Sequence, residues 1–435
     1  MIVPFETRRR KVLDAISPGA LLVFSAPVMI RNNDVEHEYR QDSDFYYLTG
    51  FEEPESVLLI VSTPEPRVIL FLRERNPERE TWDGPRLGVE RAVANLGVDE
   101  AFPIADLTSK LAELLGGCET LYYSMGYNSS ADEVVLSCLR RLRATARRGG
   151  TWPTALVESG TVLHELRLRK QDDELRSLQR AIDITSQAHK AVFASTLAGN
   201  WEYEIEAVLR AEFRKMGAER VAYSPIVASG INATVLHHRS NNRQSQAGEL
   251  ILVDAGCEYN YQSADVTRTF PANGRFTSHQ RAAYEIVLAA QYRAMQAVRP
   301  NATLDDIHME AVRELVTGLI RLGIIRESPE CSLESGSYKK YYMHRTSHWL
   351  GMDVHDVGAY HVGGKPRGLE PNMVLTIEPG LYFPADDESV PPELWGVGIR
   401  IEDDVVVTTT GFANLSEGIP KTAEEIEALM AFSRK

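Results

Sequence analysis

Up to residue 166, short apolar runs alternate with stretches of helical period along the chain. Continuous apolar runs at 57–61 and 68–72 are typical of buried strands. Residues 107–115 have a helical period, and a further apolar run follows at 121–123. Strands that alternate with helices in this way predict an α/β domain, in which no group of residues indicates a reaction.

The start of the chain is open to two interpretations. A basic cluster at 8–11 precedes an apolar stretch at 20–30, as in a secretory signal peptide. Asp14 interrupts that pattern and Pro27 splits the apolar stretch, whereas the apolar region of a signal peptide should be continuous and uncharged. We therefore favour a basic helix followed by a buried strand at 21–24.

The pattern changes near residue 166, where a dense run of charged residues, 167–174, leads into a long amphipathic helix. Charge runs usually mark only a solvated helix start, so a single continuous domain is the alternative. The difference in pattern on either side favours a boundary here. We expect one domain at 1–166 and a second at 167–435.

Beyond this boundary the order of helices and strands repeats. Helices at 172–197 and 201–217 precede strands at 250–254 and 264–270. A second helix pair and a second set of strands follow, at 278–298, 303–323, 345–349, 373–378 and 398–407. The repeat predicts an α+β domain with two related halves, and the seam between such halves is a common place for a site.

Composition narrows the classes of partner. The chain has 435 residues, 43% of them hydrophobic, and a formal net charge of -14, which is unfavourable for binding nucleic acid or an anionic membrane. No stretch approaches the roughly 20 apolar residues that span a bilayer. The four cysteines are scattered without a CxxC pair, so we expect no disulfide framework and a reducing cytoplasm.

Two aspartates begin a candidate metal site. Asp254 ends the apolar run 250–253, and Asp265 follows at a distance that suits a hairpin bringing both carboxylates together. Two adjacent carboxylates repel each other unless a cation neutralises them. Taken singly, each aspartate has an ordinary alternative as a turn residue or helix cap.

An imidazole and two glutamates complete the set. His348 lies in a histidine-rich segment with His344 and His355, and imidazole is a common metal ligand and proton shuttle. Glu378 ends the apolar run 374–377, where a carboxylate should not be buried without a partner. Glu402 ends an alternating stretch in which it shares a face with Arg400; taken alone, either glutamate could form an edge-strand salt bridge.

Four carboxylates and one imidazole suit two divalent cations. The four negative charges balance two dications, which offsets the cost of burying them. One imidazole among oxygen ligands is compatible with manganese, iron, cobalt or zinc, and the lack of thiolate argues against a structural zinc site. Two metals roughly 3.5 Å apart can share a hydroxide that is nucleophilic near neutral pH.

Longer motifs surround these residues: Val253–Gly256, Ala264–Arg268, Ser347–Gly358, Leu375–Tyr382 and Gly398–Asp403, with Tyr39–Phe51 near the N-terminus. They resemble the bacterial type of Xaa-Pro aminopeptidase (aminopeptidase P), a family of pita-bread-fold metallopeptidases, over nearly the whole chain. The resemblance implies an α/β N-terminal domain, followed by an α+β pita-bread catalytic domain with an internal pseudo-two-fold duplication. The motif at 39–51 separates the chain from methionine aminopeptidases, which lack that first domain.

The resemblance also implies a role for each metal-site residue. Asp254 would bind one metal and His348 the other. Asp265 and Glu402 would bridge the two metals. Glu378 would bind the metal held by His348 and would also shuttle the proton, first as general base and then as general acid.

Further residues would contact the substrate. His237 and His355 match the two histidines of the family that hydrogen-bond the substrate carbonyl and the oxyanion. Because His238 directly follows His237, either His237 or His238 could face the site. The resemblance places His344, Arg400 and Tyr382 in or near the substrate pocket, where His344 would line the proline pocket. It also implies that Trp82 reaches the substrate pocket of a neighbouring subunit.

The implied reaction is release of the first residue from peptides with proline in second position. The implied cofactor is a pair of divalent ions, manganese foremost, with cobalt or zinc as alternatives. We expect peptide substrates and a homo-oligomer, a dimer or tetramer, with no nucleic-acid or membrane partner. A prolidase is one alternative, since it would share all five metal ligands, but the motif at 39–51 favours aminopeptidase P. A non-catalytic binding module of this fold is the other alternative; it would have lost metal ligands, and none is lost in this sequence.

Overall fold

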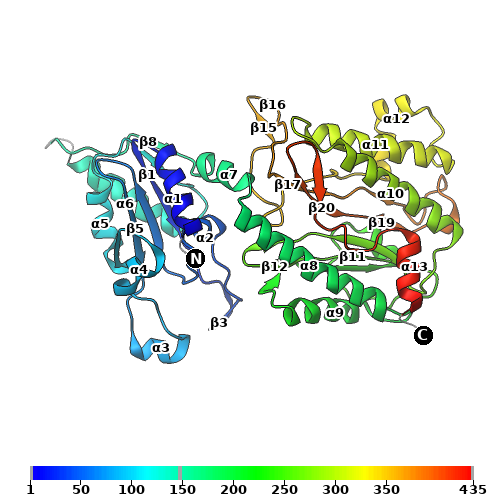
Figure 1. Cartoon of the computed structure of the whole chain (residues 1–435), viewed down its shortest axis with the longest axis horizontal. Coiled ribbons are helices and arrows are strands. Elements are labelled where there is room, and N and C mark those ends of the chain that lie inside the picture. Colours follow the sequence, from blue (N-terminus) through cyan, green and yellow to red (C-terminus); the bar gives the residue numbers. More distant parts are fainter. Residues whose placement is uncertain (1–2, 146–148, 433–435) are drawn as a thin grey trace. The chain divides into compact units, whose positions relative to one another are not determined.

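The computed structural model describes residues 3–145 and 149–432 and divides into two compact units, Met1–Leu166 and Arg167–Lys435 (Figure 1). Helix α7 (Gly160–Leu168) spans the point of division. The two units have separate hydrophobic cores, one formed around the strands of the first unit and a larger one around the helices of the second.

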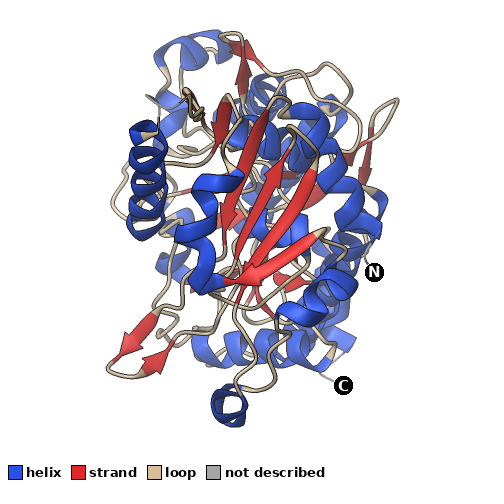
Figure 2. Cartoon of the chain, turned by 90° about the vertical axis from the view of Figure 1, so that its left-hand side faces the viewer, coloured by secondary structure: helices blue, strands red, loops and turns tan. Residues whose placement is uncertain are grey.

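The first unit is built on one mixed sheet with the strand order β6-β5-β4-β1-β7-β8. Figure 2 shows these strands side by side with helices on either side. The strands are β1 (Gly19–Phe24), β4 (Val57–Val61), β5 (Arg67–Leu72), β6 (Glu100–Pro103), β7 (Thr120–Tyr122) and β8 (Ala155–Val157). The helices are α1 (Val3–Ala15), α2 (Ser43–Thr49), α3 (Pro77–Asp83), α4 (Val89–Leu96), α5 (Leu107–Leu114) and α6 (Ser129–Ala144), and a small hairpin joins β2 (Ile30–Asn32) to β3 (Val35–Glu36).

The sequence patterns of this unit are confirmed. The continuous apolar runs form β4 and β5, whose residues are almost all buried, as expected for inner strands of a covered sheet. The basic segment forms α1, and the apolar run after it forms β1, which pairs with β4 on one side and β7 on the other. The second interpretation of the N-terminal segment, a helix followed by a buried strand, is therefore correct.

The second unit repeats one arrangement twice. The helix pair α8 (Asp172–Ser195) and α9 (Glu202–Lys215) precedes a sheet of β10 (Ile226–Ser229), β11 (Leu250–Asp254) and β14 (Thr267–Pro271). The pair α10 (Ser278–Ala297) and α11 (Leu304–Arg321) precedes a sheet of β17 (Val374–Ile377), β20 (Asp403–Val407) and β21 (Phe412–Asn414). Figure 1 shows strands of this unit between the two helix pairs.

Shorter elements complete the second unit. Strands β18 (Gly380–Tyr382) and β19 (Gly398–Arg400) form a two-stranded antiparallel sheet, which carries part of the site described below. The remaining elements are β9 (Arg220–Val221), β12 (Cys257–Tyr259), β13 (Gln262–Ser263), the hairpin β15 (His361–Val362) and β16 (Lys365–Pro366), α12 (Pro329–Ser335) and α13 (Ala423–Phe432).

Three expected strands of the second unit need correction. Residues 345–349 form no strand, because only one isolated bridge, between Trp349 and Leu375, ties this segment to β17. The strand expected at 264–270 begins at Thr267, since the N–H of Asp265 donates to the side chain of Asp404 at 3.1 Å instead of to a neighbouring strand. The strand expected at 398–407 is broken at 401–402, where the N–H of Glu402 donates to the carbonyl of Thr267.

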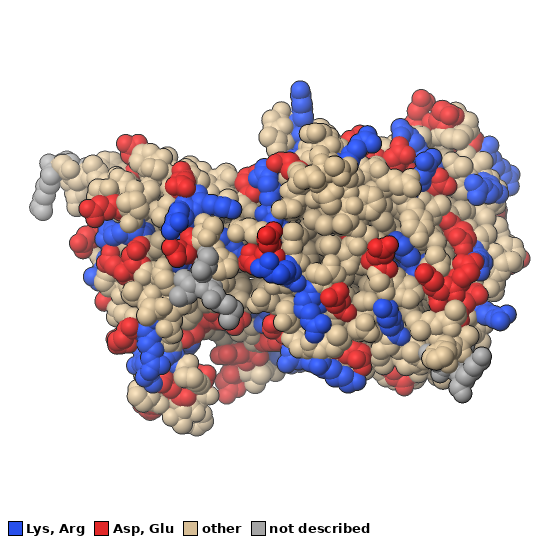
Figure 3. All heavy atoms as spheres, viewed as in Figure 1, with Lys and Arg blue, Asp and Glu red and all other residues tan. Residues whose placement is uncertain are grey.

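The surface carries both signs of charge. On the face drawn in Figure 3, acidic side chains lie among basic ones over both units. Within residues 3–145 and 149–432, we find no helix with the length and hydropathy needed to cross a membrane.

Candidate active site

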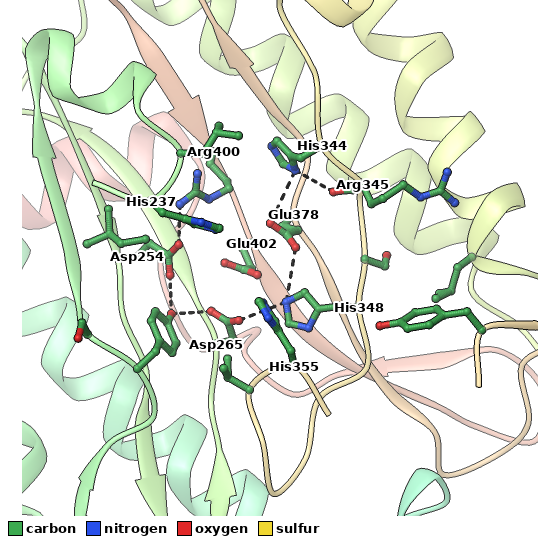
Figure 4. Close-up of a pocket in the computed structure, with 18 of the residues that line it drawn as sticks. His237, Asp254, Asp265, His344, Arg345, His348, His355, Glu378, Arg400 and Glu402 are labelled. Carbon is green, nitrogen blue, oxygen red and sulfur yellow. Dashed lines mark hydrogen bonds and ion pairs between the residues drawn. The ribbon is translucent and has the colours of Figure 1, made fainter. Parts of the chain in front are cut away.

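A cavity of about 710 Å³ lies in the second unit and gathers residues from both halves of the repeat. Figure 4 shows most of these side chains pointing toward one another across it. Nine of the residues predicted from the sequence line this cavity: His237, Asp254, Asp265, His344, His348, His355, Glu378, Arg400 and Glu402.

The two aspartates come together at the end of the first sheet. Asp254 is the last residue of β11 and pairs with Thr267 of β14, while Asp265 precedes β14 by two positions. The hydroxyl of Tyr223 donates to Asp254 and lies 2.5 Å from Oδ1 of Asp265, so it contacts both carboxylates. The predicted hairpin does bring the carboxylates together, and the structure adds Tyr223, which no motif in the sequence marked.

His348 turns one ring nitrogen toward the carboxylates. Its Nδ1 lies 3.0 Å from the carbonyl of Trp349, which must accept, so this nitrogen carries the hydrogen. Its Nε2 lies 3.4 Å from Asp265 and 3.5 Å from Glu378. Burial alone lowers the pKa of His348, but these two carboxylates raise it overall to about 9. A backbone carbonyl on one nitrogen and the other nitrogen facing oxygen ligands is the arrangement of a metal-binding histidine.

Glu402 lies at the break between β19 and β20, where its side chain accepts a hydrogen bond from Thr267 at 2.6 Å. Asp265, His348 and Glu402 each offer one ligand atom, and these atoms all lie within 4.8 Å of one another. Burial, followed by the neighbouring carboxylates, raises the pKa of Glu402 well above its ordinary value.

The pKa values of these crowded carboxylates indicate whether the cavity suits metal ions. Burial raises the pKa of Glu378 to about 7, with the charges of Asp265 and Asp254 adding to the effect while His348 opposes it. The pKa of Asp254 is raised as well, by burial first and then by Asp265. Buried carboxylates that repel each other are stabilised in their charged form by cations. The donor set therefore fits divalent ions.

A chain of hydrogen bonds joins Arg400 to His344 beside the carboxylates. Arg400 is buried, donates to Asp254 at 2.5 Å and donates to the hydroxyl of Tyr382 at 3.0 Å. That hydroxyl lies 2.9 Å from Nε2 of His344, whose Nδ1 donates to the carbonyl of Arg345 at 2.8 Å. Burial and the charge of Arg400 lower the pKa of His344 to about 3, so its imidazole is neutral. Tyr382 thus contacts the site through His344 and Arg400.

The other predicted histidines differ in their surroundings. His237 is exposed and lines the cavity, whereas His238 is buried with its Nε2 3.0 Å from Glu202. His237 is therefore the member of the pair that faces the site. The ring of His355 lies edge-on to that of His348, with centroids 4.5 Å apart, and burial followed by the charge of His348 lowers the pKa of His355.

Trp82 belongs to the other unit of the chain. It belongs to α3 of the first unit, and 82% of it is exposed. It does not line the cavity of the second unit. Its expected contact with a neighbouring subunit stays a prediction.

Comparisons with known proteins cover both units. The model of metallopeptidase family M24 matches residues 176–409, and that of the aminopeptidase P N-terminal domain matches residues 5–122. Xaa-Pro aminopeptidase of Escherichia coli (strain K12) is 42% identical over 434 residues, 99% of this chain and 98% of that protein. Xaa-Pro aminopeptidase of Haemophilus influenzae is 40% identical over 430 residues, 98% of this chain and 97% of that protein.

Solved structures match the chain as a whole. The structure of Pseudomonas aeruginosa aminopeptidase PepP has a TM-score of 0.97 at 44% identity, with 100% of both chains covered. Zn-substituted E. coli aminopeptidase P in complex with product has a TM-score of 0.97 at 41% identity, covering 100% of this chain and 99% of that one. These matches confirm the predicted fold class, an α/β domain followed by a pita-bread domain, and the family resemblance.

Proposed function

The chain belongs to metallopeptidase family M24, and from this premise we propose that it is a metal-dependent Xaa-Pro aminopeptidase. It releases the first residue of a peptide whose second residue is proline. The names of its similar bacterial relatives favour this activity over that of a prolidase. One observation carries the proposal: nine residues predicted from separate motifs line a single cavity.

We propose that the cavity holds two divalent ions, with manganese foremost and cobalt or zinc as alternatives. Asp254 would hold one ion, His348 and Glu378 the other, and Asp265 and Glu402 both. When bound, such ions would act as Lewis acids on the substrate carbonyl and lower the pKa of water at the site. The oxygen-rich donor set with one imidazole supports this choice over metals that prefer thiolates.

Glu378 moves the proton in this proposal. It takes a proton from the attacking water as the carbon–oxygen bond forms, and returns it to the proline nitrogen as the carbon–nitrogen bond breaks. Without this proton the proline nitrogen would have to leave as a strongly basic anion, so the leaving group requires the delivery. The place of Glu378 in the cavity, with its Oε1 3.5 Å from Nε2 of His348, supports the role.

The histidines position the substrate. His237 and His355 donate hydrogen bonds to the carbonyl oxygen, and these bonds strengthen as negative charge develops on it, each contributing roughly 2–4 kcal/mol. His344, held neutral between Tyr382 and the carbonyl of Arg345, offers a flat uncharged surface for the proline ring. The carboxylate-rich end at Asp254 holds the free α-amine, which restricts cleavage to the first residue.

Three further features belong to the proposal. Residues 1–166 form the aminopeptidase P-type N-terminal domain and 167–435 the catalytic domain, which the division between Leu166 and Arg167 supports. The protein works in a reducing cytoplasm, in keeping with its four free cysteines. It forms a dimer or tetramer in which the exposed Trp82 reaches a neighbouring site.

Comparing rates on a dipeptide and a tripeptide tests the activity. The proposed enzyme cleaves Ala-Pro-Pro at least as fast as Ala-Pro, because the cavity of about 710 Å³ is larger than one dipeptide requires. Ala-Ala-Pro is the matched control and should not be cleaved between its first two residues. A strict preference for the dipeptide would instead assign a prolidase, and cleavage of neither would favour a binding module.

A further inference from the structure

Two adjacent imidazoles at the edge of the cavity have opposite surroundings. Figure 4 shows the ring of His237 directed into the cavity beside Asp254 and Arg400. His238 is only 8% exposed and does not line the cavity. The mechanism uses His237 and leaves the buried neighbour without a role.

The side chain of His238 is held by Glu202, the first residue of α9, which is fully buried. Its Nε2 lies 3.0 Å from Oε2 of Glu202. The same carboxylate accepts hydrogen bonds from the N–H of Ser229 at 2.7 Å, the N–H of Arg243 at 3.1 Å and the side chain of Asn232 at 2.9 Å. Burial by itself raises the pKa of Glu202, but these hydrogen bonds lower it overall, so the group is a charged anchor.

His238 also closes a tight turn. Its N–H donates to the carbonyl of Val235 at 3.2 Å, so residues 235–238 form one turn. Leu236 and His237 occupy the tip of the turn, and both line the cavity. Because Glu202 fixes one end of the turn to α9, the ring at the tip is held in place above the carboxylates.

In the other half of the unit, His355 also precedes an anchored residue. His355 is followed by Asp356, whose side chain is 1% exposed and bonds to Lys170 at 2.8 Å and to Arg167 at 2.6 Å. The N–H of Asp356 donates to the carbonyl of Trp349 at 2.9 Å. Each of the two histidines assigned to the carbonyl oxygen therefore precedes a buried residue tied down by a charged hydrogen bond.

We propose that His238, held by Glu202, is a positioning residue that directs His237 onto the substrate carbonyl. It touches no reacting atom and acts only through the turn it anchors. The inference rests on the proposed function, because it assigns His238 to the transition-state contact made by His237. A donor held in place before the reaction costs no reorganisation when charge develops on the oxygen.

The expected effect of removing the anchor falls on kcat. His238→Ala leaves Glu202 with its hydrogen bonds from Ser229, Asn232 and Arg243, so the fold is retained. We expect kcat for Ala-Pro-Pro to fall by roughly 10-fold with KM within about 2-fold, since the lost interaction is made in the transition state. His238→Gln keeps a side-chain N–H for Glu202 and should recover most of the rate.

A double-mutant cycle separates positioning from a general structural role. If His238 acts only through His237, then His238→Ala has no further effect on kcat once His237→Ala is present. An equal loss in both backgrounds would overturn the proposal. His279→Ala, at an exposed histidine on α10, is the matched control and should leave the rate unchanged.

A spectroscopic measurement decides the point independently of activity. In protein labelled at the histidine Cε1, the signal of His237 is identified by its loss in His237→Ala. We expect His238→Ala to shift or broaden that signal while leaving those of His344 and His355 in place. An unchanged His237 signal would contradict positioning even if the wild-type protein cleaves no peptide, and absent cleavage by the wild type would count against the proposed function alone.

Discussion

Glu378 is the residue on which the proposed reaction depends most. It lies 3.5 Å from His348 and 3.9 Å from His344, at the end of β17 where the chain turns into β18. Its N–H is fixed by the carbonyl of Thr346 at 2.8 Å, so the backbone that carries the carboxylate is anchored. A carboxylate anchored in this way can take up a proton and return it from the same position.

Glu378→Ala should therefore lower kcat for Ala-Pro-Pro by roughly 100-fold or more, because the variant lacks both the proposed proton relay and a proposed metal ligand. The far-ultraviolet circular dichroism should stay that of the wild type, since the remaining contacts of β17 are unchanged. Glu388→Ala, at an exposed glutamate of the loop between β18 and β19, is the control and should keep full activity. Near-normal turnover by Glu378→Ala would remove this residue from the mechanism.

Arg268 shows how a single buried cation holds a residue of the proposed metal site in place. Its guanidinium donates to the carbonyl of Glu402 at 2.6 Å, to Asp403 at 2.7 Å and to the carbonyl of Ile419 at 3.1 Å. Burial by itself raises the pKa of Asp403, but Arg268 and Lys421 lower it to about 2. The break between β19 and β20 that presents Glu402 to the cavity thus depends on this side chain.

Replacing Arg268 with Met leaves a buried carboxylate short of a partner, which costs roughly 3–5 kcal/mol in the free energy of unfolding. Urea unfolding followed by fluorescence measures this loss. Arg281→Met, at a partly exposed arginine of α10 paired with Glu285 and Glu424, should cost less than about 1 kcal/mol. Equal losses in the two variants would show that Arg268 has no special structural role.

At the scale of elements, the sequence predicted most helices and strands because their apolar periods are long and regular. Helix α8 and strand β11 begin and end within a few residues of their expected bounds. The strand expected at 345–349 was wrong, because these residues do not alternate between apolar and polar positions. The backbone of this segment instead bonds to Thr376, at 3.1–3.2 Å, and to Glu378, at 2.8 Å. Long-range bonds of this kind are invisible in a local pattern.

The site was predictable to the extent that its residues lie in motifs. Carboxylates at the ends of apolar runs marked Asp254 and Glu378, and the structure brings them to one cavity. Tyr223 was missed because nothing in its local sequence distinguishes a tyrosine that bridges two carboxylates from one in a turn. The choice between His237 and His238 likewise required the contact with Glu202, which lies on another helix.

Helix α8 also carries a buried histidine that makes the fold sensitive to acid. His189 is fully buried, and its Nε2 lies 3.2 Å from the carbonyl of Ala255, directly after Asp254. Burial, with the charge of Arg268, lowers the pKa of His189 from 6.5 to about 4. Between these pH values the unfolded chain binds a proton at this position that the folded protein does not.

The free energy of unfolding should therefore fall as the pH drops from 6.5 to 4, by roughly 3 kcal/mol from this residue alone. His189→Gln, which keeps a side-chain N–H for the carbonyl of Ala255, should lose correspondingly less stability over the same range. His279→Gln, at an exposed position, should follow the wild type. Urea unfolding at pH 7 and at pH 4 measures the difference, and identical pH dependence in the wild type and His189→Gln would contradict the account.

At the scale of the whole molecule, the two halves of the second unit share the proposed metal site. Asp254 and Asp265 come from the first half, and His348, Glu378 and Glu402 come from the second. Ions bound by both halves would stabilise the folded state by mass action, because the unfolded chain lacks the assembled site. Metal binding, stability and peptide cleavage should therefore change together.

The most direct test is titration of chelator-treated protein with Mn²⁺ while cleavage of Ala-Pro-Pro is followed. The metal-free protein should be inactive, and activity should rise to a plateau at about two equivalents of Mn²⁺, with a parallel rise in the thermal midpoint. Asp265→Ala, which removes a ligand proposed to contact both ions, should not reach this plateau. Full activity after chelation, or a plateau at one equivalent in the wild type, would contradict a peptidase with two metal ions.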